Sequence, residues 1–250
     1  MRDFEDSTLW RVSEFERLRQ QTGSSGFVRL NGPTVLPTTL LADLRRLDAD
    51  PASGDMLEVI AACVRHREPA LLCLQHDELV WPVTVFPTEQ LYHSPRDITN
   101  VSLSGLSAMR LLTAEPPGVR PPGHGMHDRV AEAEHYRPLA PLLWKFALHG
   151  PRRALLADIA GTAAYRLVIG SDGERPHAPG ALGSALDRLQ RGSAPLREIA
   201  QWPGMSVERA SRLLNGLYLV GCLLITRTHP GAREPKTERG GWFGLGRPRR

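Results

Sequence analysis

Several features that would assign a function at once are scarce or missing in this chain of 250 residues. Aromatic residues make up 6%, and Lys145 and Lys236 are the two lysines among 31 basic residues. The chain has no Gly-Lys-Ser/Thr triplet, which excludes a P-loop, and no Gly-x-Ser-x-Gly nucleophile elbow. These absences predict a protein that is not an enzyme and uses no cofactor, and they leave a small-molecule ligand undetermined.

The three cysteines, Cys63, Cys73 and Cys222, are odd in number and have apolar neighbours. This pattern is typical of buried, reduced thiols in a cytoplasmic protein. The longest apolar run, Leu217–Ile225, is interrupted by Gly221 and is well short of the roughly 18 residues that read as a spanning helix. The first six residues are mostly charged, and no apolar stretch follows them, so a secretory signal is not expected.

The positive charge is concentrated at one end of the chain. The formal net charge is +4, and residues 227–250 alone hold seven Lys/Arg against two Asp/Glu. The rest of the chain is therefore close to neutral. A preference for Arg, Ala, Gly and Pro is typical of a GC-rich bacterial genome, so the arginine content alone does not indicate phosphate recognition.

The apolar pattern predicts an α+β fold with several parts. Residues 1–115 are expected to form an α+β unit with a small sheet. Apolar residues at helical spacing predict helices over 38–47 and 55–66, and β-rich runs predict a hairpin of strands over 70–74 and 79–86. Residues 101–112 fit a strand or a helix equally well.

A proline-rich segment, residues 115–123, cannot hold regular structure and is taken as the boundary of this unit. Residues 125–170 are then expected to form a helical hairpin bridge. Its first helix runs from Leu139 to the stop at Gly150, and its second begins near Arg152.

Residues 181–228 predict three short helices, over 181–191, 195–200 and 206–219, followed by a strand over 223–226. A Trp-Pro-Gly turn separates the last two helices. This order resembles a winged helix-turn-helix module. The resemblance implies a unit that binds DNA or another protein and does not catalyse, and it covers only this C-terminal part of the chain.

In the third helix of this module, Ala210, Leu213, Leu214 and Leu217 repeat at helical spacing and are expected to face inward. The outward positions, which would contact DNA or a protein partner, are then Glu208, Arg209, Ser211, Arg212 and Asn215. In a DNA-binding member, arginine reads guanine and asparagine reads adenine.

Two features favour a protein partner over DNA. The segment after residue 226 contains prolines and pairs poorly as the second strand of a wing. The module also carries six arginines against three acidic residues, which is modest for a domain that neutralises phosphates. We therefore expect a bacterial regulatory or adaptor protein, with a DNA-binding transcription regulator as the alternative.

Residues 229–250 form a basic, aromatic tail that is expected to be flexible. Its docking residues are Trp242, Phe243, Leu245, Arg247, Arg249 and Arg250. They could insert into a protein partner or pack on the chain's own body. A membrane surface is the least favoured contact.

A third function rests on Asn100–Gly105, which resembles the N/D-x-S-x-x-G half of the cyclic di-GMP site of the PilZ family. That family also needs an upstream R-x-x-x-R, which this chain lacks, so an ordinary strand and turn is expected there. His124, His127 and His135 are interpreted as solvated loop histidines, and no metal site is expected.

Overall fold

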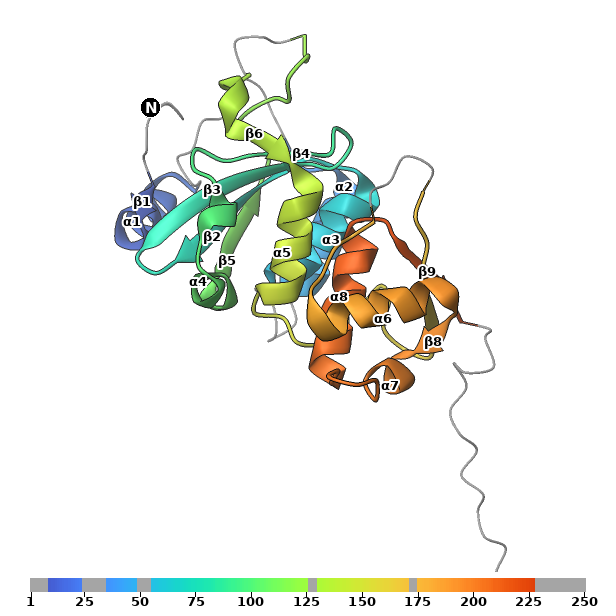
Figure 1. Cartoon of the computed structure of the whole chain (residues 1–250). Helices are drawn as coiled ribbons and strands as arrows, with labels where there is room; N and C mark the ends of the chain where they lie inside the picture. The colour runs from blue at the N-terminus through green and yellow to red at the C-terminus, as the bar shows by residue number, and fades with distance from the viewer. Residues whose placement is uncertain (1–8, 24–34, 49–54, 126–129, 171–174, 228–250) are drawn as a thin grey trace, which may run out of the picture.

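The computed structural model describes residues 9–23, 35–48, 55–125, 130–170 and 175–227. It has an α+β fold with two antiparallel sheets, as the sequence predicts (Figure 1). The larger sheet has the order β5-β2-β3-β4-β6, and the short strand β1 also pairs with β3. The smaller sheet has the order β8-β7-β9.

The centre of the larger sheet is the predicted hairpin of β2 (Ala70–His76) and β3 (Leu79–Phe86). Around it lie β1 (Trp10–Arg11), β4 (Leu91–His93), β5 (Arg110–Glu115) and β6 (Tyr136–Pro138). Alternating side chains of β2 point to opposite faces, as strand geometry requires. Leu72 and Leu74 therefore enter the main core, and Leu71 and Cys73 enter a smaller core under Phe15.

Helices cover both faces of this sheet. α1 (Val12–Thr22) supplies Phe15 to the smaller core. The main core lies under α2 (Thr38–Asp48), α3 (Met56–His66) and α5 (Leu139–His149). Asp55 caps α3 by accepting a hydrogen bond from the Leu57 backbone N–H at 2.9 Å.

Residues 101–112, which the sequence left undecided, divide between two elements. η1 (Ile98–Asn100) and α4 (Leu103–Ala108) come first, and β5 follows at Arg110. After Glu115, which ends β5, the proline-rich segment has no helix or named strand. It is not an exposed boundary, because Pro117, Gly118 and Val119 are buried. Tyr136 follows the short η3 (Ala133–His135). Its hydroxyl donates to the Arg120 carbonyl and accepts from the Ala131 N–H.

The expected helical hairpin over 125–170 is wrong in its second half. α5 ends at His149, and residues 150–162 contain no helix. The chain then forms β7 (Ala164–Leu167), which the sequence pattern did not indicate. β7 is the middle strand of the smaller sheet, between β8 and β9.

The three predicted C-terminal helices and the strand after them form in the predicted order, and a short strand between the first two helices was not predicted. These elements are α6 (Gly180–Arg191), β8 (Ala194–Pro195), α7 (Leu196–Ile199), α8 (Val207–Leu219) and β9 (Leu223–Thr226). The main core continues from the larger sheet through α5 and α8 into these elements without a break. The parts that the sequence suggested as separate units therefore share one core among the described residues.

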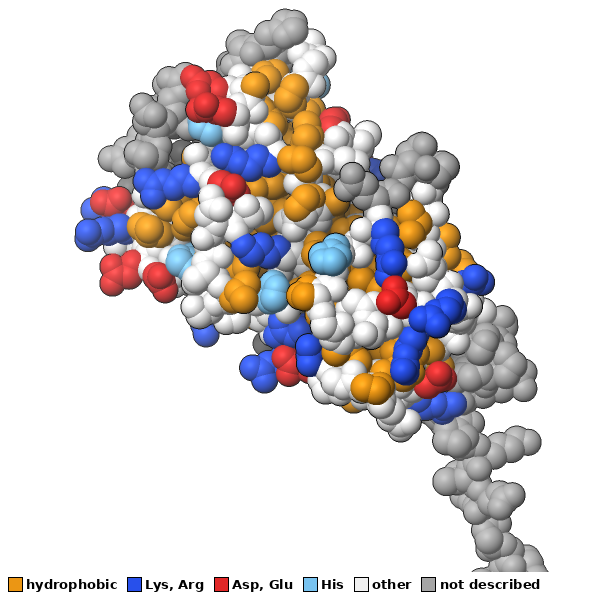
Figure 2. Space-filling view, viewed as in Figure 1, with side chains coloured by type: hydrophobic (Ala, Val, Ile, Leu, Met, Phe, Trp, Pro, Cys, Tyr) orange, Lys and Arg blue, Asp and Glu red, His pale blue; other side chains and the backbone are white. Residues whose placement is uncertain are grey.

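In the face shown in Figure 2, Lys and Arg side chains gather over α6 and α7, with fewer acidic ones between them.

Among the residues that the structure describes, no helix combines the length and the apolar character needed to cross a bilayer.

Candidate functional site

α8 carries the five residues that the sequence singled out, and its local sequence explains where it begins and ends. The Ser206 hydroxyl caps the helix by accepting a hydrogen bond from the Arg209 N–H at 3.2 Å. Gly221 follows the end of the helix with φ of +74°, a left-handed conformation that favours glycine. The prediction of a helix over 206–219 is confirmed.

The inward face of α8 is also confirmed. Ala210, Leu213, Leu214 and Leu217 are each fully buried. Three of the five residues expected to face outward are not on the surface, however. Ser211 is 1% exposed, Asn215 is 0% exposed, and the Arg212 side chain is 15% exposed. Only Glu208, about half-buried, and the exposed Arg209 remain accessible.

α5 covers one of the sides of α8 that the sequence assigned to a partner. Gly216 lies against the Trp144 indole so closely that a Cβ added there would be 2.7 Å from Trp144 Cε3. Arg212 donates to the carbonyls of Leu148 at 2.7 Å and Gly150 at 2.9 Å. These carbonyls end α5 and have no partner within that helix, so the Arg212 guanidinium caps the helix of its neighbour.

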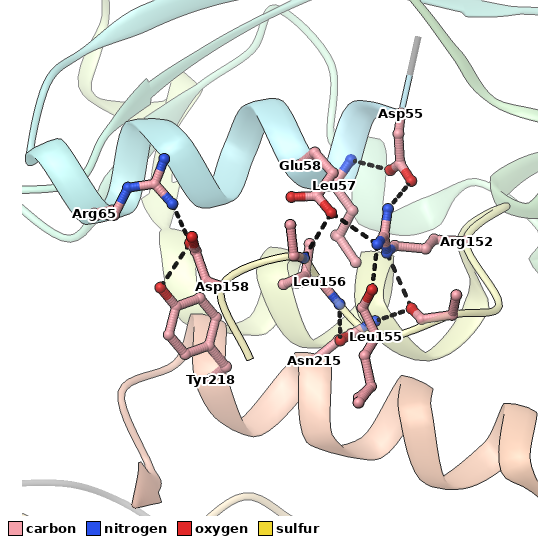
Figure 3. A network of polar contacts seen from close by, with 12 residues as sticks. Asp55, Leu57, Glu58, Arg65, Arg152, Leu155, Leu156, Asp158, Asn215 and Tyr218 are labelled. Carbon is pink, nitrogen blue, oxygen red and sulfur yellow. Dashed lines mark hydrogen bonds and ion pairs between the residues drawn. The ribbon is translucent and has the colours of Figure 1, made fainter. Parts of the chain in front are cut away.

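The segment 152–158 covers another side of α8 (Figure 3). Asn215 accepts a hydrogen bond from the Leu156 N–H at 2.9 Å and donates one to the Ala154 carbonyl at 2.9 Å. A side-chain amide has one donor and one acceptor arm, so it can pair with the backbone as a neighbouring strand would. Asn215 is therefore a structural residue, and the hypothesis that it reads adenine is not supported by its position.

The same segment is held from its other side by α3 (Figure 3). Glu58 accepts from the Ala157 N–H at 2.8 Å and forms an ion pair with Arg152 at 2.7 Å. Arg152 also pairs with Asp55 and donates to the Leu155 carbonyl. The backbone of 152–158 thus bonds to side chains of α3 and α8, which explains why it does not form the predicted helix.

Asp158 makes a third ion pair between this segment and α3. Asp158 accepts from the Tyr218 hydroxyl of α8 at 2.9 Å and also pairs with Arg65 of α3. Burial, together with the hydrogen bond to Asp158, raises the pKa of Tyr218 to about 12. Burial also raises the pKa of Glu58 above its usual value, although the Ala157 N–H and Arg152 oppose this. We call the contacts of Arg152, Asp158, Asn215 and Tyr218 with their partners the α3–α8 seam.

The segment that resembles half of a PilZ site has a different conformation from the strand and turn that we expected. Ser102 caps α4 by accepting from the Gly105 N–H at 3.1 Å, and Asn100 donates to Asp97 at 3.3 Å. These polar groups are thus used within η1 and α4. A Cβ at Gly105 would lie 2.2 Å from His76 Nε2, so this glycine allows a close approach.

Titratable groups also gather near β4 and β6. His93 is fully buried, with its ring centroid 6.0 Å from that of His135. Burial, followed by the charges of His135 and Arg137, lowers the pKa of His93 to about 3, so the ring is neutral near pH 7. Glu132, Glu134 and His135 place ligand atoms within 4.8 Å of one another, but both glutamates are exposed.

The remaining predicted site residues, Trp242, Phe243, Leu245, Arg247, Arg249 and Arg250, lie outside the described residues. So does His127.

The chain matched no family model, no curated protein and no solved structure.

Sequence reasoning missed Arg152, Asp158 and Trp202 as residues of interest. Arg152 and Asp158 had no pattern that could indicate them, because the side chains that they pair with on α3 and α8 are at least 60 residues away in sequence. Trp202 is partly buried, and the Arg188 guanidinium lies 5.3 Å from its ring centroid. Its place in the turn between two helices was the available signal.

Proposed function

We propose that this chain is a non-enzymatic, cytoplasmic adaptor or regulatory protein of bacterial type. It acts through protein contacts of its C-terminal elements, β7 to β9. The observation that carries this proposal is the enclosure of α8 by its own module, α5 and the segment 152–158.

The order of the C-terminal elements supports their likeness to a winged helix. In such a module, one strand follows the first helix and a second strand follows the third helix. A third strand lies between these two in the sheet and pairs with both. β8 and β9 occupy the first two places, and β7 pairs with both. The joining strand would then come from before the module, which removes the sequence objection that no second wing strand follows residue 226.

The enclosure of α8 argues against the alternative of a transcription regulator. A recognition helix enters the major groove with several side chains free to meet base edges and phosphates. Here Ser211 and Asn215 are buried, and Arg212 bonds to the backbone of α5. Freeing them would break the α3–α8 seam and expose the Gly216–Trp144 contact. Protein contact through the accessible surface of the module is therefore the better-supported function.

The test is fluorescence anisotropy with a labelled duplex DNA of mixed sequence and the full chain. A DNA-binding protein with 6–10 phosphate contacts loses about 10³–10⁵ in affinity between about 50 mM and about 200 mM salt. We expect no such binding. Salt-steep binding that is abolished by Arg209→Ala but not by Arg17→Ala, an exposed arginine on α1, would contradict the proposal.

A further inference from the structure

On the accessible surface of the C-terminal elements, the turn between α7 and α8 packs against its neighbours more closely than an ordinary solvated loop. We call residues 202–205, with Arg188 and Arg209 beside them, the Trp202 turn. The turn is held against α6, because a Cβ added at Gly204 would lie 2.8 Å from the Cβ of Ala181. Gly204 has φ of +73°, so both its conformation and its surroundings favour glycine.

Two guanidinium groups flank this turn. Arg188, on α6, lies over the Trp202 ring at 5.3 Å, a cation–π arrangement. Arg209, on α8, donates to the Gly204 carbonyl at 2.6 Å. Arg188 and Arg209 are both exposed, and a contact with the turn orients each side chain. Ordering them in advance lowers the entropy lost when they bind a carboxylate.

The neighbouring acidic groups are mostly occupied by other arginines. Asp187 pairs with Arg175, and Glu208 pairs with Arg212 at 3.1 Å and with Arg153 at 3.8 Å. Glu198 on α7, four residues before Trp202, is an exposed acidic residue. The charge that the turn presents is thus positive, consistent with the basic side chains over α6 and α7 in Figure 2.

Apolar surface adjoins these charges. Pro203 is exposed, Trp202 is partly exposed, and Val207, the first residue of α8, is 61% exposed. Tryptophan and arginine are enriched among residues that dominate binding energy at protein interfaces. The combination suits a partner that has both carboxylates and an apolar side chain.

We propose that the Trp202 turn docks an acidic segment of a partner protein. Carboxylates of the segment pair with Arg188 and Arg209, and an apolar side chain of the segment packs on Pro203 and Val207. This inference rests on the proposed function and names the partner's chemistry. Two arginines with apolar residues between them fit a peptide better than a nucleic acid, whose affinity depends on a row of neutralised phosphates.

The experiment measures binding of a fluorescent synthetic peptide, rich in Asp and Glu with one Leu-Phe pair, to the full chain. A second peptide replaces every Asp and Glu by Asn and Gln. The protein variants are Arg188→Glu with Arg209→Glu, and the control Arg17→Glu with Arg45→Glu. The control changes the net charge equally, at exposed arginines on α1 and α2. Circular dichroism and thermal unfolding establish that each variant is folded.

We expect the acidic peptide to bind and the neutral peptide to bind weakly. The first double variant should lose about tenfold in affinity, through both a faster dissociation rate and a slower association rate. The control variant should lose much less. Equal losses in both double variants, or equal binding of both peptides, would overturn the inference. Absence of peptide binding and of duplex DNA binding would also overturn it and leave the proposed function standing. Duplex DNA binding through Arg188 and Arg209 would overturn both.

Discussion

At the scale of single residues, Asn215 joins α8 to the segment 152–158, because its side-chain amide both accepts from and donates to the backbone of that segment. Its position on α8, away from the leucine stripe, is the one that the sequence predicts. That side of the helix is covered by the segment 152–158, whose backbone bonds to the Asn215 amide. Helical periodicity shows which residues share a face, but it does not show how many faces are covered.

Replacing Asn215 by Leu should destabilise the fold. The change leaves the Leu156 N–H and the Ala154 carbonyl without their hydrogen-bond partner in a buried place. The expected loss is about 2–6 kcal/mol, since each of the two unsatisfied buried groups costs about 1–3 kcal/mol. Urea unfolding followed by fluorescence measures it. Gln190→Leu, at an exposed position of α6, is the control and should change stability little. Equal stabilities of the two variants would contradict the role assigned to Asn215.

Asp43 should make stability depend on pH. Hydrogen bonds from His66 and then Arg65, both at 2.6 Å, lower the pKa of Asp43 below the ordinary value of 3.8 for an aspartate. An acid whose pKa is lower in the folded state stabilises the fold above its unfolded pKa. This contribution is lost as the pH falls through the folded pKa.

The free energy of unfolding of the wild-type chain should therefore fall on acidification below pH 3.8 more than that of Asp43→Asn. Urea unfolding at a series of acidic pH values compares the two. Glu16→Gln, at an exposed position of α1, serves as control and should follow the wild type. Parallel pH curves for the wild type and Asp43→Asn would exclude this contribution.

At the scale of elements, much was predictable from the sequence, and the failures share a cause. α2, α3, the hairpin of β2 and β3, α5, α8 and β9 all have strong periodicity and local stop signals, and each formed as predicted. The helix expected from Arg152 did not form, because α3 and α8 supply hydrogen bonds to that backbone. β7 was missed because its partners, β8 and β9, lie far along the chain.

The packing of α5 on α8 gives a prediction at this scale. Gly216→Ala improves helix propensity by about 1 kcal/mol. The added methyl group would, however, lie 2.7 Å from a ring atom of Trp144. Overpacking costs about 1–3 kcal/mol, so we expect net destabilisation.

Thermal unfolding should show a lower midpoint for Gly216→Ala and recovery when Trp144→Leu is added. Gly192→Ala, where a Cβ meets nothing within 4 Å, is the control. A Gly216→Ala variant that is more stable than the wild type would mean that α5 and α8 are not in this close contact.

At the scale of the whole molecule, α8 is shared between the C-terminal elements and the rest of the fold. The core that contains Leu213 and Leu217 also contains Leu72 of the larger sheet and Phe146 of α5. The sequence suggested parts joined by linkers, because prolines and glycines mark breaks in periodicity. Such breaks do not reveal whether the elements on either side pack together.

The central claim is that α8 is enclosed and does not open to present Arg212 and Asn215. Native-state hydrogen exchange of its amide protons tests this most directly. The account predicts that the amides of residues 210–219 exchange as slowly as those of β2 and β3, and only through global unfolding. Faster exchange of α8 alone, through an opening that leaves β2 and β3 protected, would contradict it.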